Sequence, residues 1–143
     1  MAGTVVADTL QADSTSTLVI KNGVANTPPT IQDSAGTQIG TFCRAWVSFD
    51  GTGTFSPNPS TTKIRASFNV SSILDTGTGQ YVVNFTNAMP DANYAWAALA
   101  GAPGVTNGNV AVGTPTTLSV PVISISTAGA VFDASYFLVS VFR

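Results

Sequence analysis

The aspartate residues of this chain are the first candidates for chemistry. Asp50-Gly51-Thr52-Gly53 and Asp75-Thr76-Gly77-Thr78-Gly79 superficially resemble calcium-binding loops. Calcium takes six to eight oxygen ligands, usually from several neighbouring carboxylates, whereas each of these aspartates stands alone. Asp and Gly are also the residues that form tight hairpin turns. We therefore interpret both segments as turns and expect no metal site.

A pair of carboxylates could hydrolyse a glycosidic bond, and Asp75, Asp91 and Asp133 are the candidates for such a pair. Each lies in a predicted turn, which is the ordinary place for Asp. The chain contains no His and no Glu, so it cannot form a Ser-His-Asp or Cys-His site alone. We expect a protein that is not an enzyme, with no catalytic residues and no cofactor. An active site shared between subunits stays open.

The remaining reactive or aromatic side chains have structural interpretations. Cys43 is the single cysteine, which excludes an intrachain disulfide, and we interpret it as a buried, unreactive thiol. Arg44 and Arg65 lie within predicted strands, either as surface residues or as interface partners of Asp. Sugar stacking is possible chemistry for three aromatic residues, but aromatic side chains in strands usually belong to the core, which we favour for Trp46, Tyr94 and Trp96.

Two loops, 55–62 and 101–109, are long for a small β domain and rich in Gly, Pro, Asn and Thr. Long loops on a rigid scaffold often carry binding sites, but they also serve as plain connections. Both interpretations stay open, and the receptor-binding residues are unknown.

The elements that must position these residues are strands. Only 8% of the 143 residues are charged, which is about a third of the usual share. Thr, Val, Phe and Ile favour strands, whereas the residues that favour helix surfaces are scarce. The net charge of −2 argues against nucleic-acid binding. No apolar run approaches the roughly 20 residues of a membrane helix, and no signal-peptide pattern is present, so we expect no membrane insertion.

Alternating apolar residues predict about six strands between residues 42 and 143. In 42–49 and 64–70 we expect inward-facing side chains at Cys43, Ala45, Val47 and Phe49, and at Ile64, Ala66, Phe68 and Val70. Segments 70–74 and 81–85 form a predicted hairpin, with Tyr81, Val83 and Phe85 on one face. Further strands are expected at 93–99, 118–125, where Pro121 predicts an edge or a bulge, and 136–142. The fold class is all-β, a small antiparallel sandwich or flattened barrel.

The first forty residues differ from the rest. Residues 1–40 contain no Phe, Tyr or Trp, and such a polar segment cannot bury enough surface to order itself alone. We expect an extended N-terminal attachment or intertwining segment at 1–40 and a β-sandwich domain at 41–143. In 136–142, Phe137, Val139 and Val141 oppose Tyr136, Leu138 and Phe142, so both faces of the strand are apolar. A lone small sandwich would show one polar face, which predicts that another subunit covers one side.

Four segments together resemble a module of bacteriophage tail-fibre and other virion proteins. They are Arg44–Gly53, Ile64–Ser72, and the pair Gly77–Phe85 and Ala88–Tyr94, in which runs such as Ile-Arg-Ala-Ser-Phe-Asn-Val-Ser-Ser and Ala-Met-Pro-Asp-Ala-Asn-Tyr occur. Residues 27–40 are similar to the leader that often precedes this module. The resemblance covers 42–94 closely and implies a trimeric β-structured appendage. It transfers no catalytic residue, and this chain is much shorter than a full fibre with its shaft.

The expected function is therefore that of a bacteriophage virion structural protein, forming a short trimeric fibre or appendage that contacts the host surface. The alternative is a capsid decoration or cement protein that stabilises the phage head. The expected partners are two further copies of the chain, other virion proteins bound through the N-terminal segment, and a host surface glycan or protein. The expected location is the virion, assembled in the cytoplasm of the bacterial host.

Overall fold

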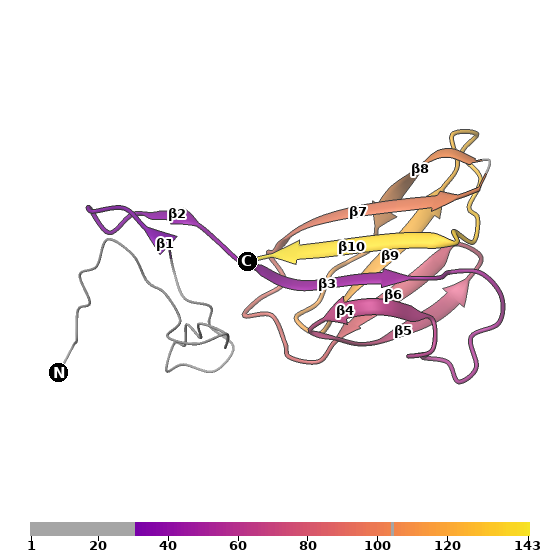
Figure 1. The fold of residues 1–143 in the computed structure, drawn as a ribbon, viewed down its shortest axis with the longest axis horizontal. Helices are drawn as coiled ribbons and strands as arrows, with labels where there is room; N and C mark the ends of the chain where they lie inside the picture. The colour runs from indigo at the N-terminus through magenta and orange to yellow at the C-terminus, as the bar shows by residue number, and fades with distance from the viewer. Residues whose placement is uncertain (1–30, 104) are drawn as a thin grey trace, which may run out of the picture.

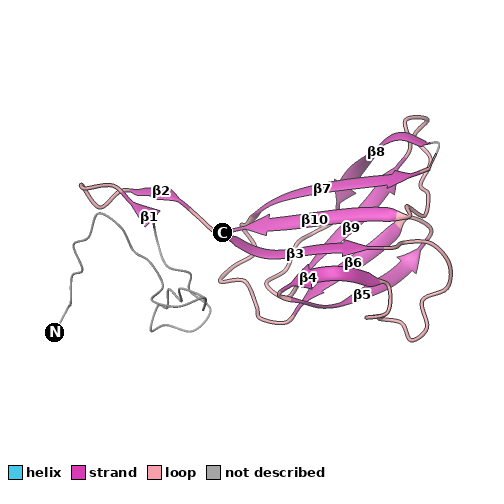
Figure 2. Ribbon diagram, viewed as in Figure 1, coloured by secondary structure: helices cyan, strands magenta, loops and turns pink. Residues whose placement is uncertain are grey.

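A computed structural model describes residues 31–103 and 105–143, and every regular element in these ranges is a strand (Figures 1 and 2). A short N-terminal hairpin is followed by the strands of the main body. The strands are β1 (Ile31–Gln32), β2 (Gln38–Gly40), β3 (Cys43–Phe49), β4 (Ile64–Phe68), β5 (Val70–Gly77), β6 (Gln80–Phe85), β7 (Ala95–Ala102), β8 (Val105–Val112), β9 (Ser119–Ile125) and β10 (Tyr136–Phe142).

The main body is one antiparallel sheet in the order β4-β3-β10-β7-β8-β9-β6-β5, folded over so that its two halves face each other (Figure 1). One layer contains β4, β3, β10 and β7, and the other contains β8, β9, β6 and β5. Edge strands β4 and β5 do not pair with each other, so the sheet is not closed. The predicted all-β antiparallel sandwich is therefore confirmed.

Aromatic rings join the two layers in the core. The Phe49 ring of β3 stacks on the Phe137 ring of β10, with 4.9 Å between ring centroids. Tyr81 of β6 meets both rings edge-on from the opposite layer, at 5.3 and 5.6 Å. Phe55 covers the other side of Tyr81. These contacts explain why the alternating positions of β3, β6 and β10 must be large and apolar.

The sequence pattern predicted most of this core. In β3, the predicted inward residues Ala45, Val47 and Phe49 are buried, while Cys43 is half-buried. The predicted hairpin is β5–β6, and Tyr81, Val83 and Phe85 are all buried.

In 64–70 the predicted inward residues Ile64 and Val70 pack against the core, but Ala66 and Phe68 face outward. Ile64 lies opposite Phe49 and packs against the core, but a bulge in the pairing then shifts the phase. Ala66 lies opposite Ser48, and Phe68 lies opposite Trp46, so both side chains are exposed on the outer surface. A bulge inserts one residue and exchanges the two faces of a strand, which the alternation alone does not reveal.

The chain passes from one layer to the other at Asn69. Its backbone is left-handed, with φ of 56°, between the end of β4 and the start of β5. Asn tolerates this conformation better than most residues because its short amide can bond nearby backbone. The Asn69 side chain donates to Arg44 O and Asn87 O, and accepts from Asn87 N.

Two predictions about the second half of the chain are wrong. Much of the predicted loop 101–109 is strand, since β7 and β8 pair as a hairpin with Ala102 opposite Val105. Pro121 lies in β9, which is an interior strand between β8 and β6. Pro121 O accepts from Gly113 N, which lies beyond the end of β8. The nitrogen of Pro121, which has no hydrogen to donate, therefore faces the point where the β8–β9 pairing ends.

The β1–β2 hairpin projects from the end of the sandwich where β3 begins and β10 ends (Figure 1). Ile31 and Ile39 are both exposed. An isolated two-stranded hairpin is marginally stable at best, so it depends on contacts beyond its own pairing. The rest of the predicted segment 1–40, residues 1–30, lies outside the described residues.

Candidate functional site

One outer surface of the sandwich carries large apolar side chains that no other residue of 31–103 or 105–143 covers. It is the outward side of the layer β4-β3-β10-β7. On this side Trp46 lies opposite both Phe68 and Ser140, and Leu138 lies opposite both Leu99 and Ser48. We call this surface the outer apolar face and define it by Trp46 (39% exposed), Phe68 (54%), Leu99 (57%), Tyr136 (57%), Leu138 (44%) and Phe142 (37%).

Strand β10 shows how the sequence builds this face. Its inward residues Phe137, Val139 and Val141 are buried, and the residues between them, Tyr136, Leu138 and Phe142, point outward. β10 lies between β3 and β7, so its outward side chains occupy the middle of the face. The predicted two-sided apolar character of 136–142 is confirmed, whereas covering of that face by another subunit stays a prediction.

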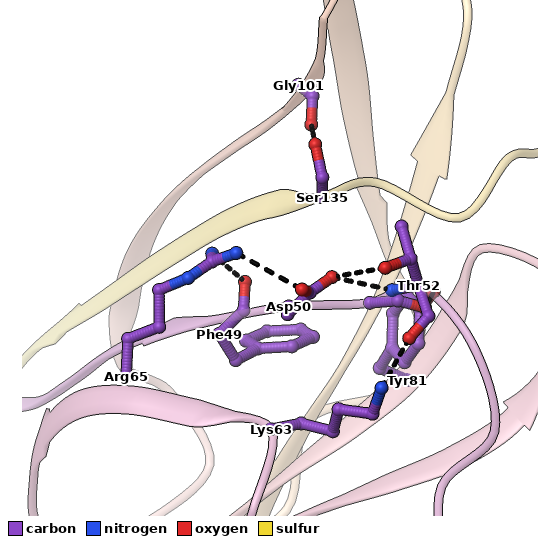
Figure 3. A network of polar contacts seen from close by, with 9 residues as sticks. Phe49, Asp50, Thr52, Lys63, Arg65, Tyr81, Gly101 and Ser135 are labelled. Atoms are coloured by element: carbon purple, nitrogen blue, oxygen red, sulfur yellow. Dashed lines mark hydrogen bonds and ion pairs between the residues drawn. The ribbon is translucent and has the colours of Figure 1, made fainter.

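A polar network of hydrogen bonds and one ion pair lies beside this face, at the end of β3 (Figure 3). Asp50 accepts hydrogen bonds from the backbone N and Oγ1 of Thr52 and pairs with Arg65 Nη2 at 3.2 Å. Arg65 also donates to Phe49 O and lies over the Tyr136 ring at 4.8 Å. Lys63 Nζ donates to Thr52 O. The expected pairing of Arg65 with an Asp is found, but within the chain.

These contacts set the ionisation of Asp50. Partial burial raises the pKa of its carboxyl, but the Thr52 hydrogen bonds and the Arg65 and Lys63 charges outweigh burial and hold the pKa below its usual range. Asp50 therefore stays ionised and binds its own turn. It is an Asx-turn acceptor, as predicted for this segment.

Tyr81 extends the network into the core. Its hydroxyl shares its one proton between Gly51 O at 2.8 Å and Asp133 Oδ1 at 2.9 Å. Burial is the largest cause that raises the pKa of Tyr81, and the hydrogen bond and charge of Asp133 add to it. Asp133 also accepts from Gly79 N at 2.7 Å. The hydroxyl held in this way links three turns, and its raised pKa keeps it protonated near neutral pH.

Among the three candidate carboxylates, Asp91 lies apart from Asp133. Asp133 precedes β10, whereas Asp91 pairs with Arg143 just after the end of β10. A seven-residue strand spans roughly 23 Å, while a glycosidase pair lies within roughly 10 Å. Asp75 lies within strand β5 and not in a turn as predicted. It accepts from Gly77 N, while Asp133 accepts from Gly79 N in the turn that follows β5. Within the described residues, no group of three or more His, Cys, Asp or Glu could hold a metal ion.

The other predicted site residues have mixed outcomes. Cys43 is half-buried and donates from Sγ to Ala45 O. Tyr94 belongs to the core as predicted, but Trp46 and Trp96 do not, because each remains more than a third exposed. Trp46 points to the outer face, and Trp96 lies at the start of β7, at the end of the sandwich.

The predicted loop 55–62 is fastened to the domain. Phe55 and Ser60 are buried, and Ser60 exchanges two backbone hydrogen bonds with Ile73 of β5. Asn58 donates its side-chain amide to Asp75 O and accepts from Asp75 N. These bonds fix the loop as part of the scaffold. Whether it binds anything else stays a prediction.

No helix in the part of the chain that the structure describes is long and apolar enough to span a membrane. Comparison with known proteins gives no family model, no curated relative and no solved structure that matches this chain.

Proposed function

We propose that this protein is a structural subunit of a bacteriophage virion, which assembles as a homotrimer into a short fibre or appendage. The observation that carries the proposal is the outer apolar face, which gathers six large exposed side chains on one layer of the sandwich. The largest exposed apolar patch of a protein is often a functional surface, such as a protein-interaction site. The resemblance of residues 42–94 to virion modules supplies the kind of assembly.

The polar network also supports a structural function. Asp50, Arg65, Tyr81 and Asp133 hold turns and strands together, and each bonds to backbone or to another member of the network. We predict that the purified protein does not cleave capsule, lipopolysaccharide or peptidoglycan, as followed by release of reducing ends. Release that Asp133→Asn abolishes would contradict this prediction.

The N-terminal region is the proposed point of attachment to other virion proteins. The β1–β2 hairpin stands apart from the sandwich at the end where the chain enters β3, which leaves the opposite end for contact with a host surface glycan or protein (Figure 1).

Labelling of purified phage particles that encode this chain tests the proposal. Gold-labelled antibodies against 41–143, viewed by electron microscopy, should mark the tail or its appendages. Label spread over the head would favour the alternative, a capsid decoration protein. Particles that lack the protein altogether, by labelling and by mass spectrometry, would overturn the proposal.

A further inference from the structure

We infer that the outer apolar face is where copies of this chain bind one another. The inference deepens the proposed function by naming the contact surface, and it rests on that proposal only for the number of copies. The choice of surface comes from the area, the charge and the shape of the face.

The area of the face suits a subunit contact. Its six large side chains are between 37% and 57% exposed. Since a large side chain presents on the order of 200 Å², together they leave roughly 550 Å² uncovered. A standard interface buries about 800 Å² on each partner. The small residues between them, among them Ala66, Ala97 and Ser140, can supply the remainder.

The charge of the face suits a second copy of the same chain. Strands β3, β4, β7 and β10 contain no acidic residue, and their only charged residues are Arg44 and Arg65. Arg44 is buried, and Arg65 is already paired with Asp50 at the rim. Two copies that meet through this face therefore bring no unpaired like charges together. A charged partner protein would meet no opposite charge at the centre of the outer apolar face.

The face also carries a shallow hollow. Ala97 and Ser140 leave a hollow of about 230 Å³ between them and the larger Leu99 and Leu138. A cavity of roughly 150 Å³ accepts a benzene ring, so this hollow is wide enough for one large side chain. Protruding side chains of that size, such as Trp46 and Phe68, lie on the same face. A surface that carries both projections and a recess of that size can pack against a second copy of itself.

Two leucines with nearly equal exposure allow a matched experiment. Leu99 lies on the face and is 57% exposed, whereas Leu118 lies before β9 in the other layer and is 59% exposed. We compare the full-length protein with its Leu99→Glu and Leu118→Glu variants by light scattering after size exclusion. Far-ultraviolet circular dichroism verifies the fold of each, and Leu138→Asn serves as a milder second variant on the face.

The wild type and Leu118→Glu should be trimers at micromolar concentration. Leu99→Glu should be a folded monomer, with a dissociation constant raised on the order of 100-fold or more, because assembly would bury the new carboxylate. Leu138→Asn should weaken the assembly less.

Three outcomes would contradict the inference. A trimer that survives Leu99→Glu would show that another surface joins the copies and would leave the proposed function standing. Equal dissociation of both Glu variants would remove the case for this face. A wild-type monomer near 14.6 kDa would overturn both the interface and the proposed assembly. A dimer that Leu99→Glu dissociates would keep the face but contradict three copies.

Discussion

Removing the hydroxyl of Tyr81 tests the structural interpretation of the polar network. In Tyr81→Phe, Gly51 O and Asp133 Oδ1 both lose a donor, while Asp133 keeps its bond from Gly79 N. A hydrogen bond to a charged group contributes roughly 1.5–3 kcal/mol. We expect the free energy of unfolding to fall by about 2 kcal/mol, which corresponds to a Tm lower by about 7 °C for a chain of this size.

Tyr94→Phe is the matched control. The Tyr94 hydroxyl also reaches two acceptors, Thr116 O and Ser119 O, but both are uncharged backbone carbonyls. A neutral hydrogen bond contributes about 1 kcal/mol, so this variant should lose about half as much stability. Both are measured by urea unfolding at equal protein concentration, since any assembly makes stability concentration-dependent.

A double-mutant cycle identifies the source of the difference. In an Asp133→Asn background the acceptor is retained without its charge, so Tyr81→Phe should cost about 1 kcal/mol less than in the wild type. If Tyr81→Phe costs no more than Tyr94→Phe, or the same with and without the Asp133 charge, then the proposed charge-assisted link between the turns is wrong.

Three further predictions address packing, ionisation and domain limits. Gly51→Ala should destabilise the domain by roughly 2 kcal/mol or more in thermal unfolding, because the new Cβ would lie 2.6 Å from the Tyr81 hydroxyl, whereas Gly101→Ala, with nothing within 4 Å, should be close to neutral. The pKa values of Tyr81 and Tyr94 are raised in the folded protein, the latter to about 12. The stability that these two neutral hydroxyls contribute is therefore complete below pH 10 and is lost as the pH rises above 10. Urea unfolding between pH 9 and 12 should show the free energy of unfolding fall, and the fall should be smaller in each Phe variant. Limited proteolysis should cleave before residue 41 first, and early cleavage within 64–85 would contradict the predicted boundary.

The sequence predicted the fold wherever alternation was regular. In β3, β6 and β10 large apolar residues recur at every second position, and the structure buries them in one core. The predictions failed where an unseen partner strand decides the outcome. The bulge opposite Ser48 and Phe49 reversed the phase of β4 after Ile64, and no residue type in 64–70 announces it.

Strand β8 was missed because its sequence resembles a loop. Gly108 lies opposite Ala100 in the β7–β8 hairpin, so pairing overrides a composition that disfavours strands. The interior position of Pro121 was not predicted for a related reason. The missing N–H of a proline is unfavourable only where the neighbouring strand continues beside it, and β8 ends there.

Part of the candidate site could be predicted from the sequence. The apolar residues on both sides of 136–142 correctly predicted an uncovered face on β10. The positions of Trp46, Phe68 and Leu99 on that same face follow from strand order and register, which bring together four strands from distant parts of the chain. Periodicity within one segment cannot contain that information.

The central position of β10 has a kinetic consequence. β10 pairs with β3, so the sheet joins segments roughly ninety residues apart, and Thr41 Oγ1 even bonds Arg143 O, 102 residues along the chain. Domains dominated by such distant pairings fold in milliseconds to seconds, since a long loop must close before the contacts form. Until β10 inserts between β3 and β7, both edges of that gap and the inward rings of Phe49 and Phe137 are open to other chains. Refolding yield should therefore fall steeply with protein concentration, even where the folded subunit is stable.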